Sequence, residues 1–230
     1  MTSRPLGSPP ASRSAEPAGR PTIPRSWPVP VVLILLSAIP LTTGALRLVQ
    51  LAGGPAIIPA NERFTGFPLP LVLHIVGAAT YALLGILQFV PRIRRRHSAW
   101  HRRSGRVLVV AGLLVAGSAL WLTLAFQRQP GSGDLLYVLR LIFGAALAAC
   151  LVLGFVAIRR RDLVAHRAWM IRAYAIAVAA GTQAFTEGIT EAVFGTGELT
   201  GDLAKAAGWL INLGVAEYAI RRRPRATVPR

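Results

Sequence analysis

Two histidines occupy equivalent places in two arginine-rich segments of the chain. Residues 93–106 read IRRRHSAWHRRSGR and residues 158–172 read IRRRDLVAHRAWMIR, so an IRRR block and four further residues precede His101 and His166. Two imidazoles at one depth on separate membrane helices can supply both axial ligands of a b-type haem. Guanidinium groups would bind its propionates. The candidates for this role are Arg102, Arg167 and Arg172. A haem-b-binding redox protein is therefore one hypothesis.

The same pattern has a second interpretation, in which the His-Arg pairs lie at the membrane surface. His101 precedes the apolar run that begins at Val107, whereas haem ligands usually lie within a span. Arginines placed next to apolar runs are typical of the cytoplasmic membrane interface, where anionic lipid headgroups lie. In this interpretation both histidines contact lipid phosphates and neighbouring loops.

A second group of polar side chains falls inside or beside apolar runs. Arg140 and His74 lie a few residues into two such runs, and Gln183 and Glu187 are spaced to share one helix face. An arginine below the membrane interface must pair, extend to the interface or face water. We predict that Glu187 pairs with Arg140, with His74 and Gln183 close by, in an outward-open polar pocket for a small ligand. The alternative is a packing cluster whose arginine extends to the interface.

The elements that must position these side chains are membrane-spanning helices. Apolar residues make up 53% of the chain and charged residues 15%, and the charges gather between long apolar runs. Runs of about 18 or more apolar residues can cross a hydrocarbon layer of about 30 Å. We predict an all-α, six-helix transmembrane bundle, in which no helix is visibly broken as in transporter folds. The predicted spans are 28–46, 68–90, 107–126, 135–158, 168–186 and 203–220.

Basic residues predict the orientation of the bundle. Most of the 26 basic residues fall in the two tails and in the loops after the second and fourth spans, and most of the nine acidic residues fall in the other loops. Because basic residues favour the cytoplasmic side, both termini should be cytoplasmic, in a bacterial inner membrane. Residues 1–27 should be a disordered tail and 221–230 a basic tail. The arginines should meet anionic lipid headgroups and no nucleic acid.

The two arginine-rich segments belong to a longer internal repeat. LQFVPRIRRR at 87–96 aligns with LGFVAIRRR at 153–161, and VLHIVGAA at 72–79 aligns with VLRLIFGAA at 138–146. Spans two and three therefore look like a duplicated hairpin with spans four and five. An offset of two spans preserves direction, so the copies would be parallel repeats and His101 and His166 would lie at one depth.

These residues carry a resemblance to a known family. The elements are LH-x2-G at 73–77, LQF at 87–89, HR-x2-GR at 101–106 and HR-x-WM-x-R at 166–172. Together they resemble the bacterial membrane protein family designated domain of unknown function 2306, which implies several spans and no established activity. The haem hypothesis resembles the cytochrome b561-like arrangement in architecture alone. No nucleophile triad, carboxylate pair or phosphate-binding glycine loop is visible, so we predict no catalytic or metal-binding residues and favour a non-enzymatic protein.

Overall fold

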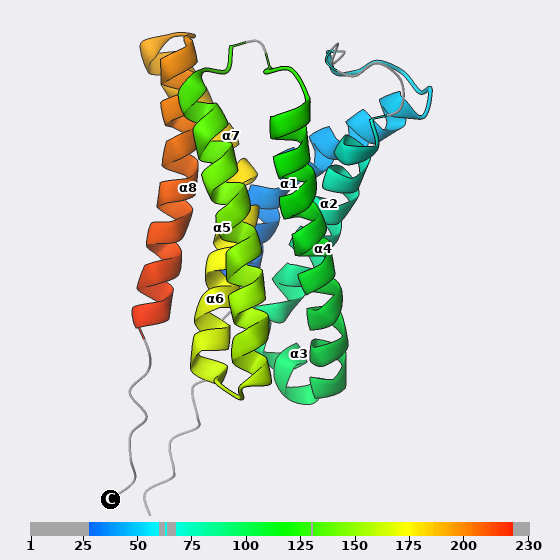
Figure 1. Ribbon diagram of the computed structural model, residues 1–230, viewed down its shortest axis with the longest axis vertical. Coiled ribbons are helices and arrows are strands. Elements are labelled where there is room, and N and C mark those ends of the chain that lie inside the picture. The colour runs from blue at the N-terminus through cyan, green and yellow to red at the C-terminus, as the bar shows by residue number, and fades with distance from the viewer. Residues whose placement is uncertain (1–27, 60–62, 64–67, 130, 223–230) are drawn as a thin grey trace, which may run out of the picture.

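The computed structural model describes residues 28–59, 63, 68–129 and 131–222, and these residues are helical wherever they are regular. Figure 1 shows α4, α5, α6 and α8 side by side along the long axis, while α1 runs obliquely to them. We call the end where α2, α5 and α8 begin the upper end, and the end where α4 and α6 begin the lower end. The helices are α1 (Pro28–Leu51), α2 (Leu69–Gln88), α3 (Pro91–Arg96), α4 (Ser98–Ala125), α5 (Asp134–Arg159), α6 (Leu163–Ala177), α7 (Ala179–Phe194) and α8 (Glu198–Arg221).

Four helices of the described residues are long and apolar enough to cross a membrane. They cover the first four predicted spans, and α4 begins before the predicted residue 107 because its polar first turns are helical as well. The last two predicted spans fall on α6, α7 and α8. These helices are less apolar, and α8 carries charged side chains in its first turns and at Glu217. The four apolar helices are Val29–Leu51, Leu69–Gln88, Ser98–Ala125 and Asp134–Arg159.

The segment predicted as one helix over 168–186 is broken, which corrects that prediction. Val178 separates α6 from α7 with φ −89° and ψ 8°. The side chain of Asn212 on α8 donates a hydrogen bond of 3.0 Å to the carbonyl of Ala175, three residues before the break. Asn212 also accepts a hydrogen bond of 2.7 Å from Thr182, after the break. Side chains of a neighbouring helix thus bind polar groups on both sides of the interruption.

Close helix contacts surround a core of buried side chains, among them Tyr81, Leu108, Leu151 and Tyr174. In sequence order α2 packs on α4, α4 on α5, α5 on α6 and α7 on α8, while α6 also packs on α8. The hydroxyl of Tyr174 on α6 donates a hydrogen bond of 2.9 Å to the carbonyl of Ala82 on α2, and its ring lies against Gly85. A Cβ on Gly85 would lie 2.1 Å from that ring, so α2 and α6 require glycine there.

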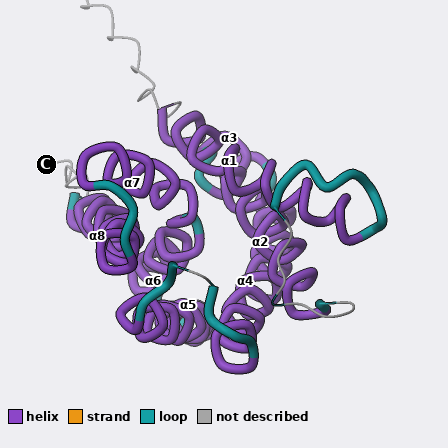
Figure 2. Tube along the Cα trace, turned by 90° about the horizontal axis from the view of Figure 1, so that it is seen from above, coloured by secondary structure: helices purple, strands orange, loops and turns teal. Residues whose placement is uncertain are grey.

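Helix α1 lies at the side of the bundle and contacts α2 and α7 (Figure 2). Its closest approach is to Gly181, where a Cβ would lie 1.9 Å from the carbonyl oxygen of Leu36. Pro40 has no N–H and cannot donate to that carbonyl within its own helix. The main chain of α1 therefore faces the main chain of α7 just after the break at Val178.

The two arginine-rich corners have different backbones despite their shared sequence frame. The first contains the short helix α3, which begins at Pro91. The second is a tight turn in which Arg161 has φ 61° and the Asp162 carboxylate accepts hydrogen bonds from the first turn of α6. The two histidines nevertheless occupy the same helix position, because the N–H of His101 and that of His166 each bond to the carbonyl of the residue that precedes the helix.

Candidate functional site

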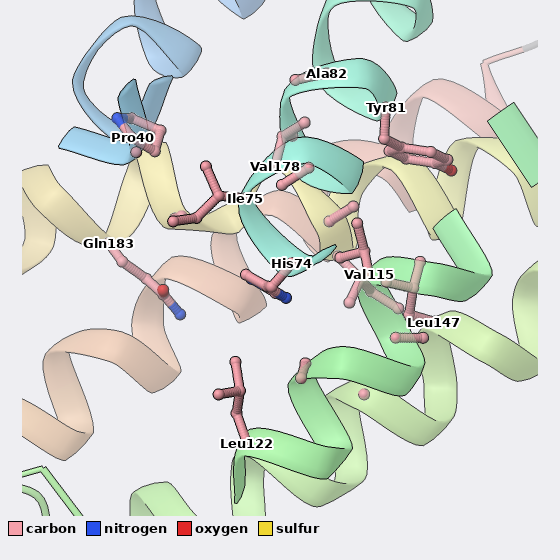
Figure 3. A pocket seen from close by; sticks show the side chains of 18 of the residues that line it. Pro40, His74, Ile75, Tyr81, Ala82, Val115, Leu122, Leu147, Val178 and Gln183 are labelled. Atoms are coloured by element: carbon pink, nitrogen blue, oxygen red, sulfur yellow. The ribbon is translucent and has the colours of Figure 1, made fainter. Parts of the chain in front are cut away.

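A cavity of about 520 Å³ lies in the upper half of the bundle (Figure 3). This volume falls within the range of small-molecule sites, about 300–1,000 Å³. Helices α1, α2, α4, α5, α6, α7 and α8 all line it, together with Arg63 from the segment between α1 and α2. Most lining side chains are apolar, among them Ile75, Val115, Phe143 and Leu147. The cavity is therefore a largely apolar space with a few polar side chains, which is the usual composition of a binding site.

Three cationic side chains line this cavity, namely Arg63, Arg140 and Lys205. Arg140 lies about two turns into α5. It interacts electrostatically with the positive charge of Arg63 and with the negative charges of Asp202 and Glu187. Within the described residues Arg140 makes no hydrogen bond or ion pair with another side chain. Burial lowers the pKa of Arg63, whose guanidinium donates to the carbonyl of Gln127 at 3.2 Å. The three cationic side chains of the lining therefore outnumber the two carboxylates near them, those of Asp202 and Glu187.

His74 lies on the α2 wall of the cavity, and Figure 3 shows its ring among the lining side chains. Its Nδ1 lies 3.2 Å from the hydroxyl oxygen of Ser118, which itself donates to the carbonyl of Leu114 at 2.6 Å. Because that hydroxyl proton is already used, Nδ1–H of His74 is the donor to Ser118. In the neutral ring this assignment leaves Nε2 as a hydrogen-bond acceptor.

The ion pair of Glu187 differs from the prediction. Glu187 forms its ion pair with Lys205 on α8, not with Arg140. Gln183 donates a hydrogen bond of 3.0 Å to the carbonyl of Lys205, so α7 and α8 are joined at this level by two polar contacts. Lys205 lies on α8, the helix that packs on α7, and it pairs with the Glu187 carboxylate in place of Arg140. Among the four predicted ligand-binding residues, His74, Arg140 and Gln183 line the cavity.

Sequence reasoning did not include Arg63, Lys205 or Ser37 in this site, although all three line the cavity. A signal for the first two was present, since they belong to the few basic residues on the predicted outer side. Ser37 lies within an apolar run and gave no such signal. Its hydroxyl is buried and has no hydrogen-bond partner among the residues that the structure describes.

The residues of the haem hypothesis lie at the opposite, lower end of the bundle. Figure 1 shows that α4 and α6, which carry His101 and His166, both begin there. The Nδ1 of His166 donates to the carbonyl of Gly154 at 2.8 Å, an arrangement that orients Nε2 as metal-ligating histidines require. The cavity described above includes neither histidine. Haem binding stays a prediction, and the absorption spectrum of protein produced with ample haem would test it.

The arginines assigned to haem propionates have other contacts. Arg172 forms a two-point ion pair with Glu217, with N–O distances of 2.5 and 3.1 Å. Its guanidinium also lies 4.9 Å from the ring centre of Trp169. Arg167 donates to the carbonyl of Ala219 at 3.4 Å, while Arg102 is exposed. Arg172 is therefore engaged in joining α6 to α8.

The fold and the composition of its helices define an integral membrane protein, all-helical over the described residues. The chain belongs to the family described as predicted membrane protein DUF2306, whose profile matches residues 71–220. This result confirms the resemblance seen in the sequence. Comparison with curated proteins and with solved structures finds no match for the chain.

Proposed function

We propose that the protein is a six-span membrane protein that binds a small amphipathic anion in the upper cavity. The observation that carries the proposal is Arg140, a cation inside a largely apolar cavity and without a hydrogen-bonded or ion-paired partner among the described residues. An arginine at this depth is costly unless it pairs or meets water. A carboxylate or phosphate on a ligand would supply the missing partner, because guanidinium binds such groups through two parallel hydrogen bonds.

The apolar part of the cavity suits the remainder of such a ligand. Below the level of Arg140 the lining side chains include Leu147, Ala78 and Ile176, which offer surface for an alkyl group. His74 and Gln183 are the polar neighbours able to orient the head of the ligand. The ligand would thus place its charge at the upper end and its hydrocarbon toward the middle of the bundle.

The chain has six spans if α6 and α7 together form a fifth span and α8 forms the sixth. The polar groups of α7 and α8 bond to one another, as Thr186 does with the carbonyl of Ala204 at 2.7 Å. Helix α8 also exposes the side chains of Leu203, Leu210 and Val215, which suits contact with lipid. A helix of 24 residues is roughly 36 Å long and sufficient to cross the hydrocarbon layer.

The orientation and the duplicated hairpin are parts of the same proposal. Arginines exposed at the lower end favour a cytoplasmic location for that end and contact with anionic lipid headgroups in a bacterial inner membrane. The equivalent helix positions of His101 and His166 support a hairpin α2–α4 that is repeated as α5–α6. Both termini are cytoplasmic in this arrangement.

The experiment is ligand binding to purified protein with Arg140→Gln and a matched control, Arg128→Gln. Arg128 lies outside the cavity lining and pairs with Asp134 in an exposed position. With decanoate as the probe and native mass spectrometry or calorimetry as the readout, Arg140→Gln should weaken binding about 10- to 100-fold, the equivalent of about 1.5–3 kcal/mol for a charged hydrogen bond. The control should bind as the unaltered protein does. Equal affinities for both variants, or no binding of any anionic amphiphile by the unaltered protein, would contradict the proposal.

A further inference from the structure

Ser37 on α1 is a buried hydroxyl whose hydrogen-bonding capacity is unused. It is 4% exposed and lines the cavity, and within the described part of the chain its Oγ has no hydrogen-bond partner. The other two buried serines differ, since Ser104 donates to the carbonyl of Trp100 at 2.7 Å and Ser118 to that of Leu114 at 2.6 Å. Bonding to the preceding turn is the ordinary solution for a helical serine. The hydroxyl of Ser37 is therefore available to a group inside the cavity.

The position of Ser37 relative to Arg140 follows from the contacts between helices. The neighbouring residue, Leu36, touches Gly181 with its main-chain carbonyl. On α7 and α8, Gln183 packs against Gly208, three residues beyond Lys205. Gly181 and Gln183 are two residues apart on α7, and Lys205 and Gly208 are three residues apart on α8. At the rise of an α-helix, these five residues place Lys205 roughly 7 Å above the level of Ser37. Phe143, one turn below Arg140, stacks on Trp209 with ring centres 4.5 Å apart, which sets Arg140 near the level of Lys205.

Main-chain polar groups add to the polarity of this inner region. Pro40 removes the helix donor for the carbonyl of Leu36, and the break at Val178 interrupts the hydrogen-bond ladder of α6 and α7. Both Pro40 and Val178 line the cavity. Irregular backbone at membrane depth is tolerated where it is buried in protein or faces a cavity. Ser37 thus lies in a polar region at the inner end, separated from the cationic region by apolar side chains.

We infer that the ligand carries a second polar group, a hydroxyl or carbonyl at the end of the chain opposite its anion, which hydrogen-bonds to Ser37 Oγ. This inference rests on the proposed function, because it describes the far end of the same ligand. A ligand of this class satisfies Arg140 at one end of the cavity and Ser37 at the other. A plain alkyl chain would leave the serine hydroxyl without a partner.

The test compares saturated carboxylates from hexanoate to hexadecanoate with their ω-hydroxy counterparts. The unaltered protein should bind one ω-hydroxy acid about tenfold or more tightly than the plain acid of equal length. Ser37→Ala should abolish this preference while it retains the affinity for plain acids. The matched control on the same helix is Thr43→Ala, because Thr43 is exposed and its hydroxyl already bonds to Ile39. This variant should keep the preference.

Thermal unfolding without ligand provides the second readout. Ser37→Ala removes a hydroxyl that has no partner, so it should melt at or above the temperature of the unaltered protein. A lowered melting temperature would indicate a structural role and overturn the inference. Plain and ω-hydroxy acids bound equally at every length would overturn it too, while the proposed function stands. Failure of the unaltered protein to bind either series would overturn both.

Discussion

The contact between α1 and Gly181 allows a sharp test of how the cavity is enclosed. In Gly181→Ala the new Cβ would lie 1.9 Å from the carbonyl oxygen of Leu36, and the clash involves main chain on both sides. Neither helix can relieve it by rotating a side chain, so α1 must move away. Overpacking of this kind costs about 1–3 kcal/mol and occasionally more. The matched control is Gly188→Ala on the same helix, where a Cβ would meet nothing within 4 Å.

The control separates packing from helix propensity. Both substitutions remove a helical glycine, which by itself stabilises a helix by up to about 1 kcal/mol. Gly188→Ala should therefore be neutral or stabilising, and the two variants should differ by the packing cost of about 1–3 kcal/mol. For a chain of this size that difference corresponds to at least roughly 2 °C in the unfolding midpoint, measured in detergent by circular dichroism or fluorescence. Equal midpoints for the two variants would refute the reasoning, because the close main-chain contact would then carry no energetic weight.

Two further predictions concern polar contacts of α8. Asp202 is 1% exposed and accepts hydrogen bonds from the N–H groups of Gly133 and Leu136 at the start of α5. Asp202→Ala should lower the free energy of unfolding by about 1–2 kcal/mol, as loss of a helix cap does. The exposed control Glu198→Ala should change the unfolding midpoint little. Equal shifts for the two variants would contradict the capping role. Asn212→Leu removes the donor to the carbonyl beside the α6–α7 break and should cost about 0.6–1.7 kcal/mol, measured the same way. An unchanged or raised midpoint for Asn212→Leu would argue that the break is stable without this side chain.

The first four apolar helices could be predicted from the sequence because run length alone identifies them. Capping of α6 by Asp162 is equally local, since the carboxylate bonds to the N–H groups of Val164 and Ala165. The break at Val178 could not be predicted in this way. No proline or glycine marks it, and its support comes from Asn212, a residue far along the chain that folding brings beside Ala175.

Part of the candidate site could also be predicted from local sequence, and part could not. His74, Arg140 and Gln183 stand out as polar residues in apolar runs, and the structure brings them to one cavity. The pairing of Glu187 depended on which cation of another helix lies nearest, and periodicity within one helix contains no information about that. Ser37 is a small residue that sequence reasoning treats as packing, and only its missing partner sets it apart.

Helix α1 lies outside the part of the chain that the family profile matches. The family match begins at residue 71 and so covers Arg140 and Lys205, whereas α1 ends at Leu51, before the match. Arg140 and Lys205 thus belong to the matched region, whereas Arg63 and the wall that carries Ser37 lie before it. Under the proposed function, a change confined to this peripheral helix would alter which chain ends the cavity accepts, while Arg140, the residue proposed to bind the anion, stays the same.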